Sequence, residues 1–260
     1  MGVLNVTPDS FSDGGDFLDP EVAVRAAREM VEQGAALVDV GGESTRPGSD
    51  PLPLEDEVAR VLPVVRSLAG EMPGRISVDT YKAKVAAAAL EAGAFMINDI
   101  SALRMDPEMV AVVRDAGCPV VLMHMQGTPK TMQEAPAYDD VVEDVYRFLL
   151  ERLEWAVDQG VREENLLIDP GIGFGKTLEH NLALLRNLEV FRSLGRPLVV
   201  GASRKRFLGE ILGVAEPKQR DQATAITTAL AVLAGAHLVR VHRVDLNRDA
   251  VRVARAVRGW

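Results

Sequence analysis

The sequence has few of the residues on which disulfide scaffolds, zinc sites and basic binding surfaces depend. A single cysteine, Cys118, stands in 260 residues, which excludes an internal disulfide and any cysteine-rich metal site. The four histidines include no pair with metal-ligand spacing on a helix, so a structural zinc is not expected. Lysine and arginine number 29 against 38 aspartates and glutamates, a net charge of −9. That balance argues against nucleic acid or an anionic membrane surface as the main partner.

Long apolar stretches are also absent. No apolar run reaches the roughly 18 residues that span a bilayer. Residues 1–15 lack the basic start and apolar core of a secretion signal. The single cysteine fits a reducing compartment, so we expect a cytoplasmic protein. Hydrophobic residues make up 47% of the chain and charged residues 26%, as in an ordinary globular protein.

A recurring local pattern indicates the fold. A helical stretch ends in glycine and a short apolar run follows, as where Gly34 precedes residues 35–40. Glycine supplies the left-handed conformation after a helix, and short continuous apolar runs are typical of strands covered on both faces of a parallel sheet. The expected strands are 2–4, 35–40, 75–78, 94–97, 118–123, 166–168, 197–200 and 237–241. The expected helices are 20–33, 54–69, 82–92, 107–116, 139–159, 178–194, 219–234 and 246–257.

Eight strand–helix units in a chain of this length predict an α/β fold, the (β/α)8 or TIM barrel. Neither a linker nor a low-complexity stretch divides the sequence, so a single domain over residues 1–260 is expected. The pattern alone leaves an open, doubly wound sheet as the alternative.

Polar residues end almost every expected strand. The carboxyl ends of barrel strands meet at one face, which is where active sites lie. The polar residues at these ends are Asn5, Glu43, Asp79, Asn98, His124, Asp169, Ser203, Lys205, Arg240 and His242. Any one of them could merely cap the following helix, but the whole set exceeds what a barrel built only for stability requires.

Two expected loops carry candidate ligand-binding groups. The loop at residues 5–15 is rich in oxygen ligands, and Mg²⁺ takes few protein oxygens and completes its shell with water and phosphate. Asn5 and Asp13 are therefore candidate magnesium ligands, the alternative being a solvated loop of Asx turns. In the loop at 41–53, Arg46 either meets an anionic substrate group or lies in solvent. Arg240 and His242 alternate along one strand, face the same way, and form with Lys205 a candidate cationic anion site.

The glycine-rich segment at residues 169–177 imitates two nucleotide-binding motifs but matches neither. A Walker A loop requires glycine where Pro170 stands, and the dinucleotide fingerprint requires glycine where Lys176 stands. The segment therefore predicts a turn that allows close backbone approach beside Asp169.

Several segments of the sequence resemble the signatures of the dihydropteroate synthase family and occur in the same order along the chain. MGVLNVTPDSFSDGG at 1–15 and ALVDVGGESTRPG at 36–48 are similar to its two leading signatures. SVDTYK at 77–82, INDI at 97–100, DPGIGFGK at 169–176, GASRKRF at 201–207 and RVH at 240–242 follow in the family's order. The resemblance covers almost the whole chain.

The resemblance implies a transferase of folate biosynthesis that joins 6-hydroxymethyl-7,8-dihydropterin diphosphate to p-aminobenzoate and releases diphosphate and 7,8-dihydropteroate. It also implies Mg²⁺ on the diphosphate and a homodimer. The residues implied for the pterin are Asp79, Asn98, Asp169 and Lys205, and those for the diphosphate are Arg240, His242 and Asn5, with Asn5 near the metal. Those implied around p-aminobenzoate are Asp13, Thr45, Arg46, Pro47, Phe174 and Lys205, and Met123 is a further expected substrate-binding residue. The catalytic set is Asp13, Asp169, Lys205, Arg240 and His242.

Two other functions compete with this one. A pterin-binding methyltransferase shares the barrel but needs no diphosphate site, and a non-catalytic pterin-binding paralogue would only sense or scaffold. Removing one charge-stabilising donor costs about 10²–10³ in turnover. We therefore expect Arg240→Ala or His242→Ala to depress turnover far more than melting temperature. Two residues depart from the family pattern: Arg206 stands where a small hydroxyl residue is common, and Arg243 where an acid is frequent.

Overall fold

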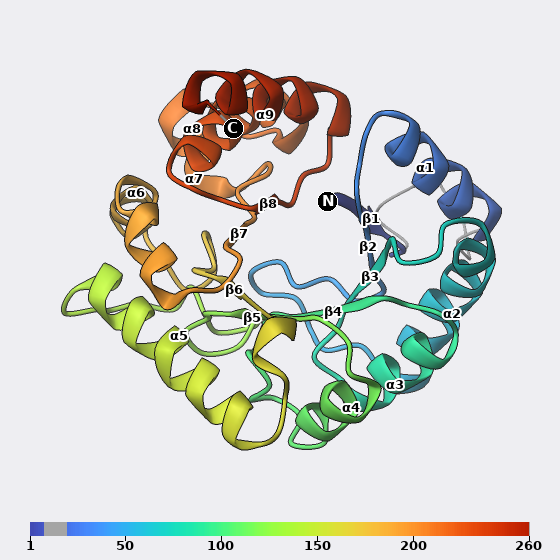
Figure 1. Ribbon diagram of the computed structural model, residues 1–260. Helices are drawn as coiled ribbons and strands as arrows, with labels where there is room; N and C mark the ends of the chain where they lie inside the picture. The colour runs from blue at the N-terminus through green and yellow to red at the C-terminus, as the bar shows by residue number, and fades with distance from the viewer. Residues whose placement is uncertain (8–19, 260) are drawn as a thin grey trace.

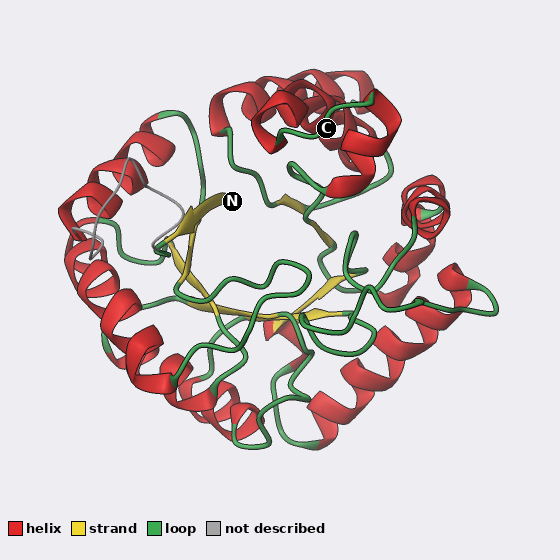
Figure 2. Ribbon diagram, turned by 180° about the vertical axis from the view of Figure 1, so that it is seen from behind, coloured by secondary structure: helices red, strands yellow, loops and turns green. Residues whose placement is uncertain are grey.

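The computed structural model describes residues 1–7 and 20–259, in which parallel strands form a ring that helices surround (Figures 1 and 2). The strands are β1 (Gly2–Asn5), β2 (Val38–Gly41), β3 (Ile76–Asp79), β4 (Met96–Asp99), β5 (Val120–Met123), β6 (Leu166–Asp169), β7 (Val199–Val200) and β8 (Leu238–Val239). The α-helices are α1 (Pro20–Glu32), α2 (Leu54–Glu71), α3 (Ala83–Glu91), α4 (Met109–Ala116), α5 (Val141–Asp158), α6 (Leu178–Arg186), α7 (Arg206–Leu212), α8 (Asp221–Leu233) and α9 (Val244–Arg258). The 3-10 helices are η2 (Glu163–Asn165), η3 (Leu188–Leu194) and η4 (Pro217–Arg220).

The strands form two parallel sheets that meet at two seams. Strands β1 to β6 pair in chain order, and β7 pairs with β8. Isolated parallel bridges join Ile168 to Leu198 at one seam and Gly2 to Val241 at the other. At the second seam the Val3 N–H donates to the Val241 carbonyl at 2.9 Å. The ring is thus linked on both sides, which confirms the barrel and excludes the open sheet.

Alternation along each strand separates an outer core from the barrel interior. Outward residues such as Val40 and Val78 belong to the main core that the helices cover. Inside the barrel, Met96, Val121 and Val199 form a small apolar layer toward the amino ends of the strands. Above that layer the inward side chains are polar, because successive strand residues point to opposite faces. The sequence therefore places its polar groups inside the carboxyl end of the ring.

Two helices differ from the sequence expectation. The expected helix 178–194 is divided at Asn187 into α6 and η3. The Asn187 side chain donates to the Ala183 carbonyl at 2.9 Å, the local hydrogen bonding that makes asparagine unfavourable inside helices. The short helix α7 was not expected; it ends at Gly213, whose φ of +68° suits glycine. Within the described part of the chain, no helix combines the length and apolarity of a membrane span.

Candidate active site

Arg240 lies at the centre of the carboxyl end of the ring, between two buried carboxylates. Its Nε donates to Asp39 Oδ2 at 2.6 Å and its Nη2 to Asp79 Oδ2 at 2.7 Å. Burial opposes the charge on Arg240, but the carboxylates of Asp39 and Asp79 hold its pKa above the usual range. The guanidinium is therefore a permanent cation whose charge is balanced from two neighbouring strands.

Asp39 is a site residue that the sequence reasoning missed. It is fully buried and also accepts hydrogen bonds from Ser77 Oγ at 2.5 Å and from Asn98 Nδ2 at 3.0 Å. Its signal in the sequence was a carboxylate inside an apolar run, alternating with Val38 and Val40 and so facing the interior. Asp39 fixes both the Arg240 guanidinium and the Asn98 amide.

Asp79 keeps one acceptor available. Its Oδ2 is bonded to Arg240, whereas its buried Oδ1 has no hydrogen-bond partner among the residues that the structure describes. Burial raises the pKa of Asp79, and Arg240 opposes that rise. A buried acceptor without a partner costs free energy. This oxygen therefore suits a donor that a ligand would bring.

Asp169 and Lys205 lie together across β6 and the loop after β7. Asp169 Oδ1 accepts the Gly171 backbone N–H at 2.7 Å. Burial raises the pKa of Asp169, and the nearby Lys205 lowers it. Lys205 Nζ donates to the Ile172 carbonyl and lies 4.4 Å from the centre of the Phe174 ring. Burial lowers the pKa of Lys205 to about 7, while Asp169 raises it.

His242 is held as a neutral hydrogen-bonding group. Ser203 Oγ accepts the His242 backbone N–H at 3.2 Å and lies 2.9 Å from its Nδ1. We assign the hydroxyl as the donor to Nδ1, which places the ring hydrogen on Nε2. Burial, followed by the charges of Arg204 and Arg240, lowers the pKa of His242 to about 3. In the chain without ligand, His242 is therefore a neutral imidazole that Ser203 orients, and its role as a cation beside diphosphate stays a prediction.

The loop at 41–53 is fixed at its base and exposed at its tip. Glu43 accepts hydrogen bonds from Tyr81 Oη at 2.7 Å and from Lys82 Nζ at 2.5 Å. At the tip, Thr45 is half-buried, and Arg46 and Pro47 are exposed. The positive charge of Arg46 contributes to the lowered pKa of His242, which places this tip on the same side of the ring.

Met123 and Phe174 provide an apolar surface beside the polar groups. Met123 is buried at the end of β5, and Phe174 packs against its cluster from the loop after β6. The other members of the cluster are Tyr81, Ile100, Met125 and Met132. The structure thus brings both predicted pocket residues into one apolar wall.

The residues around Asn5 fit a metal ion that takes few protein ligands. Strand register places Asn5 beside Gly41 and Gly41 beside Asp79. A side chain added at Gly41 would put its Cβ 3.5 Å from Asn5 Oδ1 and 3.7 Å from Asp79 Oδ2, so glycine leaves both oxygens facing one small space. Residues 1–7 and 20–259 contain no group of three or more histidine, cysteine, aspartate or glutamate side chains that could hold a metal. Mg²⁺ held mainly by substrate and water oxygens is compatible with this donor set. Asp13 lies outside the described residues.

The remaining departures lie on the surface. Arg206 is exposed and pairs with Glu210 at 2.7 Å, and Arg243 pairs with Asp245 at 2.6 Å.

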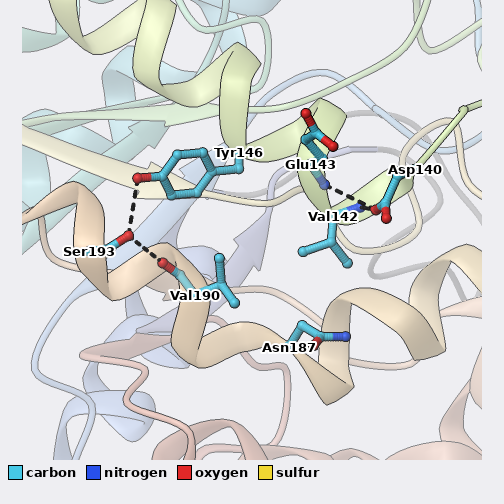
Figure 3. Close-up of a pocket in the computed structure, with 7 residues that line it drawn as sticks. All are labelled: Asp140, Val142, Glu143, Tyr146, Asn187, Val190 and Ser193. Carbon is cyan, nitrogen blue, oxygen red and sulfur yellow. Dashed lines mark hydrogen bonds between the residues drawn. The ribbon is translucent and has the colours of Figure 1, made fainter.

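A groove of about 530 Å³ also lies on the outer surface, between the start of α5 and η3 (Figure 3). Its lining residues are Asp140, Val142, Glu143, Tyr146, Asn187, Val190 and Ser193. None of the predicted site residues that the structure describes lines this groove.

The fold and the site together define a class of protein: a barrel enzyme whose strand ends present acids, a lysine and an apolar wall to a small polar ligand. A model of the pterin-binding enzyme family matches residues 1–242. The dihydropteroate synthase of Escherichia coli is 46% identical over 256 residues, covering 98% of this chain and 90% of the relative. The chain belongs to the pterin-binding enzymes and, within them, to the dihydropteroate synthases, which are alkyl-transferring enzymes of the folate pathway.

Solved structures agree with this assignment. The Yersinia pestis dihydropteroate synthase, in complex with a sulfonamide drug, superposes with a TM-score of 0.95 at 43% identity, covering 100% of this chain and 94% of that one. The Xanthomonas albilineans enzyme has been solved with 4-aminobenzoic acid (TM-score 0.92, 47% identity, 100% and 92% covered) and with 7,8-dihydropteroate (TM-score 0.89, 45% identity, 100% and 93% covered).

Proposed function

We propose that this chain, as one domain over residues 1–260, catalyses the Mg²⁺-dependent condensation of 6-hydroxymethyl-7,8-dihydropterin diphosphate with p-aminobenzoate. The products are 7,8-dihydropteroate and diphosphate. The observation that carries the proposal is the convergence of Asp79, Asp169, Lys205 and Arg240 on one end of the ring. The ligands of the Xanthomonas albilineans enzyme, 4-aminobenzoic acid and 7,8-dihydropteroate, support the same chemistry for this chain.

The buried acids suit the edge of a pterin. A pterin presents an amino group and a ring N–H side by side, which one carboxylate accepts as two parallel bonds. We assign this role to Asp169 and a further contact to the free oxygen of Asp79. Lys205 donates to the ring carbonyl, and Asn98, held by Asp39, contacts the remaining ring edge. The apolar wall of Met123 and Phe174 covers the ring face.

The p-aminobenzoate site is proposed at the outer rim. Phe174 and the stem of Lys205 flank the benzene ring. Thr45, Arg46 and Pro47 lie at the tip of the loop at 41–53, where the exposed cation of Arg46 suits the carboxylate. We also place Asp13 at this site, because its segment resembles the first signature of the family.

Catalysis falls mainly on the leaving group, because an aromatic amine is a neutral nucleophile that needs no strong base. Asn5, with Asp13, would hold Mg²⁺, which supplies positive charge to the diphosphate oxygens. His242 donates a hydrogen bond from its Nε2–H to the departing diphosphate, and Arg240 keeps a fixed positive charge beside it. Donors placed in advance where charge develops stabilise a transition state without reorganisation.

A product assay tests the proposed function. The purified chain is supplied with the pterin diphosphate, Mg²⁺ and p-aminobenzoate, and diphosphate and dihydropteroate are quantified. We expect both products in equal amounts, dependent on p-aminobenzoate and abolished by EDTA. Absence of both would leave a binding-only protein, and pterin binding with corrinoid methylation would indicate the methyltransferase.

His242→Ala is expected to lower kcat by about 10²–10³-fold, because one donor to the leaving group is lost. The ring is hydrogen-bonded through its side chain only to Ser203 in the described residues, so the melting temperature should fall by a few degrees at most. Steady-state kinetics and thermal denaturation measure the two effects. Ser203→Ala, which frees the ring without removing it, should give an intermediate loss. Wild-type kcat in His242→Ala would remove this residue from the mechanism.

The homodimer is proposed on an exposed apolar face. Ile226, Leu230 and Leu233 share one side of α8, and Val253 and Val257 one side of α9, all of them exposed. These helices pack together beside β8 (Figure 1). Contiguous exposed apolar side chains on packed helices mark interaction surfaces, and we propose a second copy of the chain as the partner.

Leu230→Asp is expected to convert the dimer to a monomer, because a charge cannot be buried unpaired in an apolar interface. Light scattering after size exclusion measures the mass. Val157→Asp, the same kind of change at an exposed apolar side chain on α5, is the matched control and should leave the mass unchanged. A monomeric wild-type chain at micromolar concentration would contradict the proposal.

A further inference from the structure

Lys176 is a buried lysine that hydrogen-bonds to no carboxylate among the residues that the structure describes. Its side chain is 3% exposed, and its Nζ lies 2.9 Å from His124 Nδ1 and 2.9 Å from the Phe174 carbonyl. Its third direction faces the Tyr138 ring, whose centre is 5.9 Å away. An amino group that gives up water for these three acceptors is costly to bury, which points to a use beyond filling space.

His124 presents a fixed acceptor to this lysine. The residue follows β5, its backbone N–H donates to the Asp169 carbonyl at 3.0 Å, and its ring packs edge-on against Phe148 with centres 4.8 Å apart. Burial, followed by the charge of Lys176, lowers the pKa of His124 to about 2. The imidazole is therefore neutral, and we assign its hydrogen to Nε2, so that Nδ1 accepts from the Lys176 amino group.

The contact lies under the glycine-rich turn that follows β6. A Cβ on Gly171 would lie 1.8 Å from the His124 carbonyl oxygen, so the turn passes directly over His124. The Tyr138 hydroxyl donates to the Gly175 carbonyl at 2.6 Å, and Gln133 Nε2 donates to the Gly173 carbonyl at 2.9 Å. The turn is thus fixed to the segment that follows β5, with Lys176 as its buried attachment.

The same turn carries the groups that hold Lys205. The Ile172 carbonyl accepts the Lys205 ammonium, and the Phe174 ring lies against that ammonium. The Lys176 Nζ donates to the Phe174 carbonyl, and the Lys205 Nζ lies against the Phe174 ring. Any rotation of the turn at Phe174 therefore moves both supports of Lys205.

We propose that Lys176, through His124, is a positioning residue that sets the turn at 170–175 for ligand binding by Phe174 and Lys205. This inference rests on the proposed function, which assigns Phe174 and Lys205 to both substrates. Lys176 does not touch the reacting atoms; it acts through the Phe174 carbonyl.

Lys176→Met tests the role, because methionine fills similar volume without a donor. Burial lowers the pKa of Lys176 well below its usual value, and an apolar side chain of similar size removes the cost of burying its amino group. We expect the melting temperature to be maintained while the Kd for pteroic acid, measured by calorimetry, rises tenfold or more. The KM values for both substrates should rise with it. Lys84→Met, on the exposed side of α3, is the matched control and should change neither quantity.

His124→Phe removes the other partner of the same contact and keeps the packing of the ring. It should raise the Kd for pteroic acid to a similar extent, and the double variant should be no more than about twofold worse than Lys176→Met, because coupled residues do not add. A lowered melting temperature with an unchanged Kd in the folded variants would overturn the inference and leave a structural role. A wild-type chain that neither binds pteroic acid nor forms product would instead overturn the proposed function.

Discussion

Asp169→Asn is expected to lower kcat/KM for the pterin diphosphate by about 10⁴-fold. A site built to hydrogen-bond a polar ligand discriminates by about this factor when donors and acceptors no longer match. Asparagine preserves the shape, and its carbonyl oxygen can still accept the Gly171 N–H that Asp169 Oδ1 accepts at 2.7 Å. Its amide NH₂ would face the donors of the pterin edge instead of accepting from them. The loss should therefore be in recognition and not in folding.

Initial-rate kinetics and calorimetry with pteroic acid measure this loss. Asp158→Asn is the matched control, since Asp158 is exposed at the end of α5. Its kinetics and melting temperature should equal those of the wild type. Retention of more than a tenth of the wild-type kcat/KM in Asp169→Asn would show that another group reads the pterin edge.

Arg240→Met is expected to lower the free energy of unfolding by about 3–5 kcal/mol in addition to abolishing most activity. Removing one partner of a buried ion pair leaves an uncompensated buried charge, which costs about that much. Here two carboxylates, Asp39 and Asp79, would lose their common cation. The sequence-based expectation that a change at Arg240 spares the melting temperature is therefore revised, whereas for His242 it stands as a prediction.

The loss of folding stability in Arg240→Met should depend on pH in a defined direction. The pKa of Asp79 is raised by burial even with Arg240 present. An acid whose pKa is higher in the folded state than in the unfolded state destabilises the fold at pH values above its unfolded-state pKa. The effect disappears as the acid is protonated on lowering the pH. Arg240→Met should thus lose more stability at pH 8 than at pH 5. Chemical denaturation at both pH values measures this, and Arg240→Met/Asp79→Asn should recover part of the loss at pH 8.

The general architecture was predictable because it depends on local chemistry. Glycine after most of the expected helices and an apolar run after those glycines predict strand and helix in turn, and the ring follows from their number. The short helix α7 has no such run of its own and was missed. The division at Asn187 depends on one side chain bonding to Ala183, a competition that periodicity does not reveal.

The site was predictable as a set of residues but not as a set of pairs. Strand ends identified Asp79, Asp169 and Arg240, because all parallel strands end on one side. Which acid meets which cation depends on register across the ring, so neither the Arg240–Asp39 pair nor the neutral state of His242 followed from the sequence. Lys205 was also identified from the end of its strand and Phe174 by resemblance, whereas the contact of Lys205 with the Ile172 carbonyl required the folded turn.

The two seams have a consequence for how binding and stability are related. The acids Asp39, Asp79 and Asp169 stand on the six-stranded sheet, whereas Lys205, Arg240 and His242 come from the sheet of β7 and β8, which an isolated bridge joins to it at each seam. A ligand that contacts residues of both sheets links the two sheets. Saturation at 100 times Kd should then protect the whole chain by about 2.7 kcal/mol, and amide hydrogens at the two junctions should show the greatest slowing of exchange with deuterium.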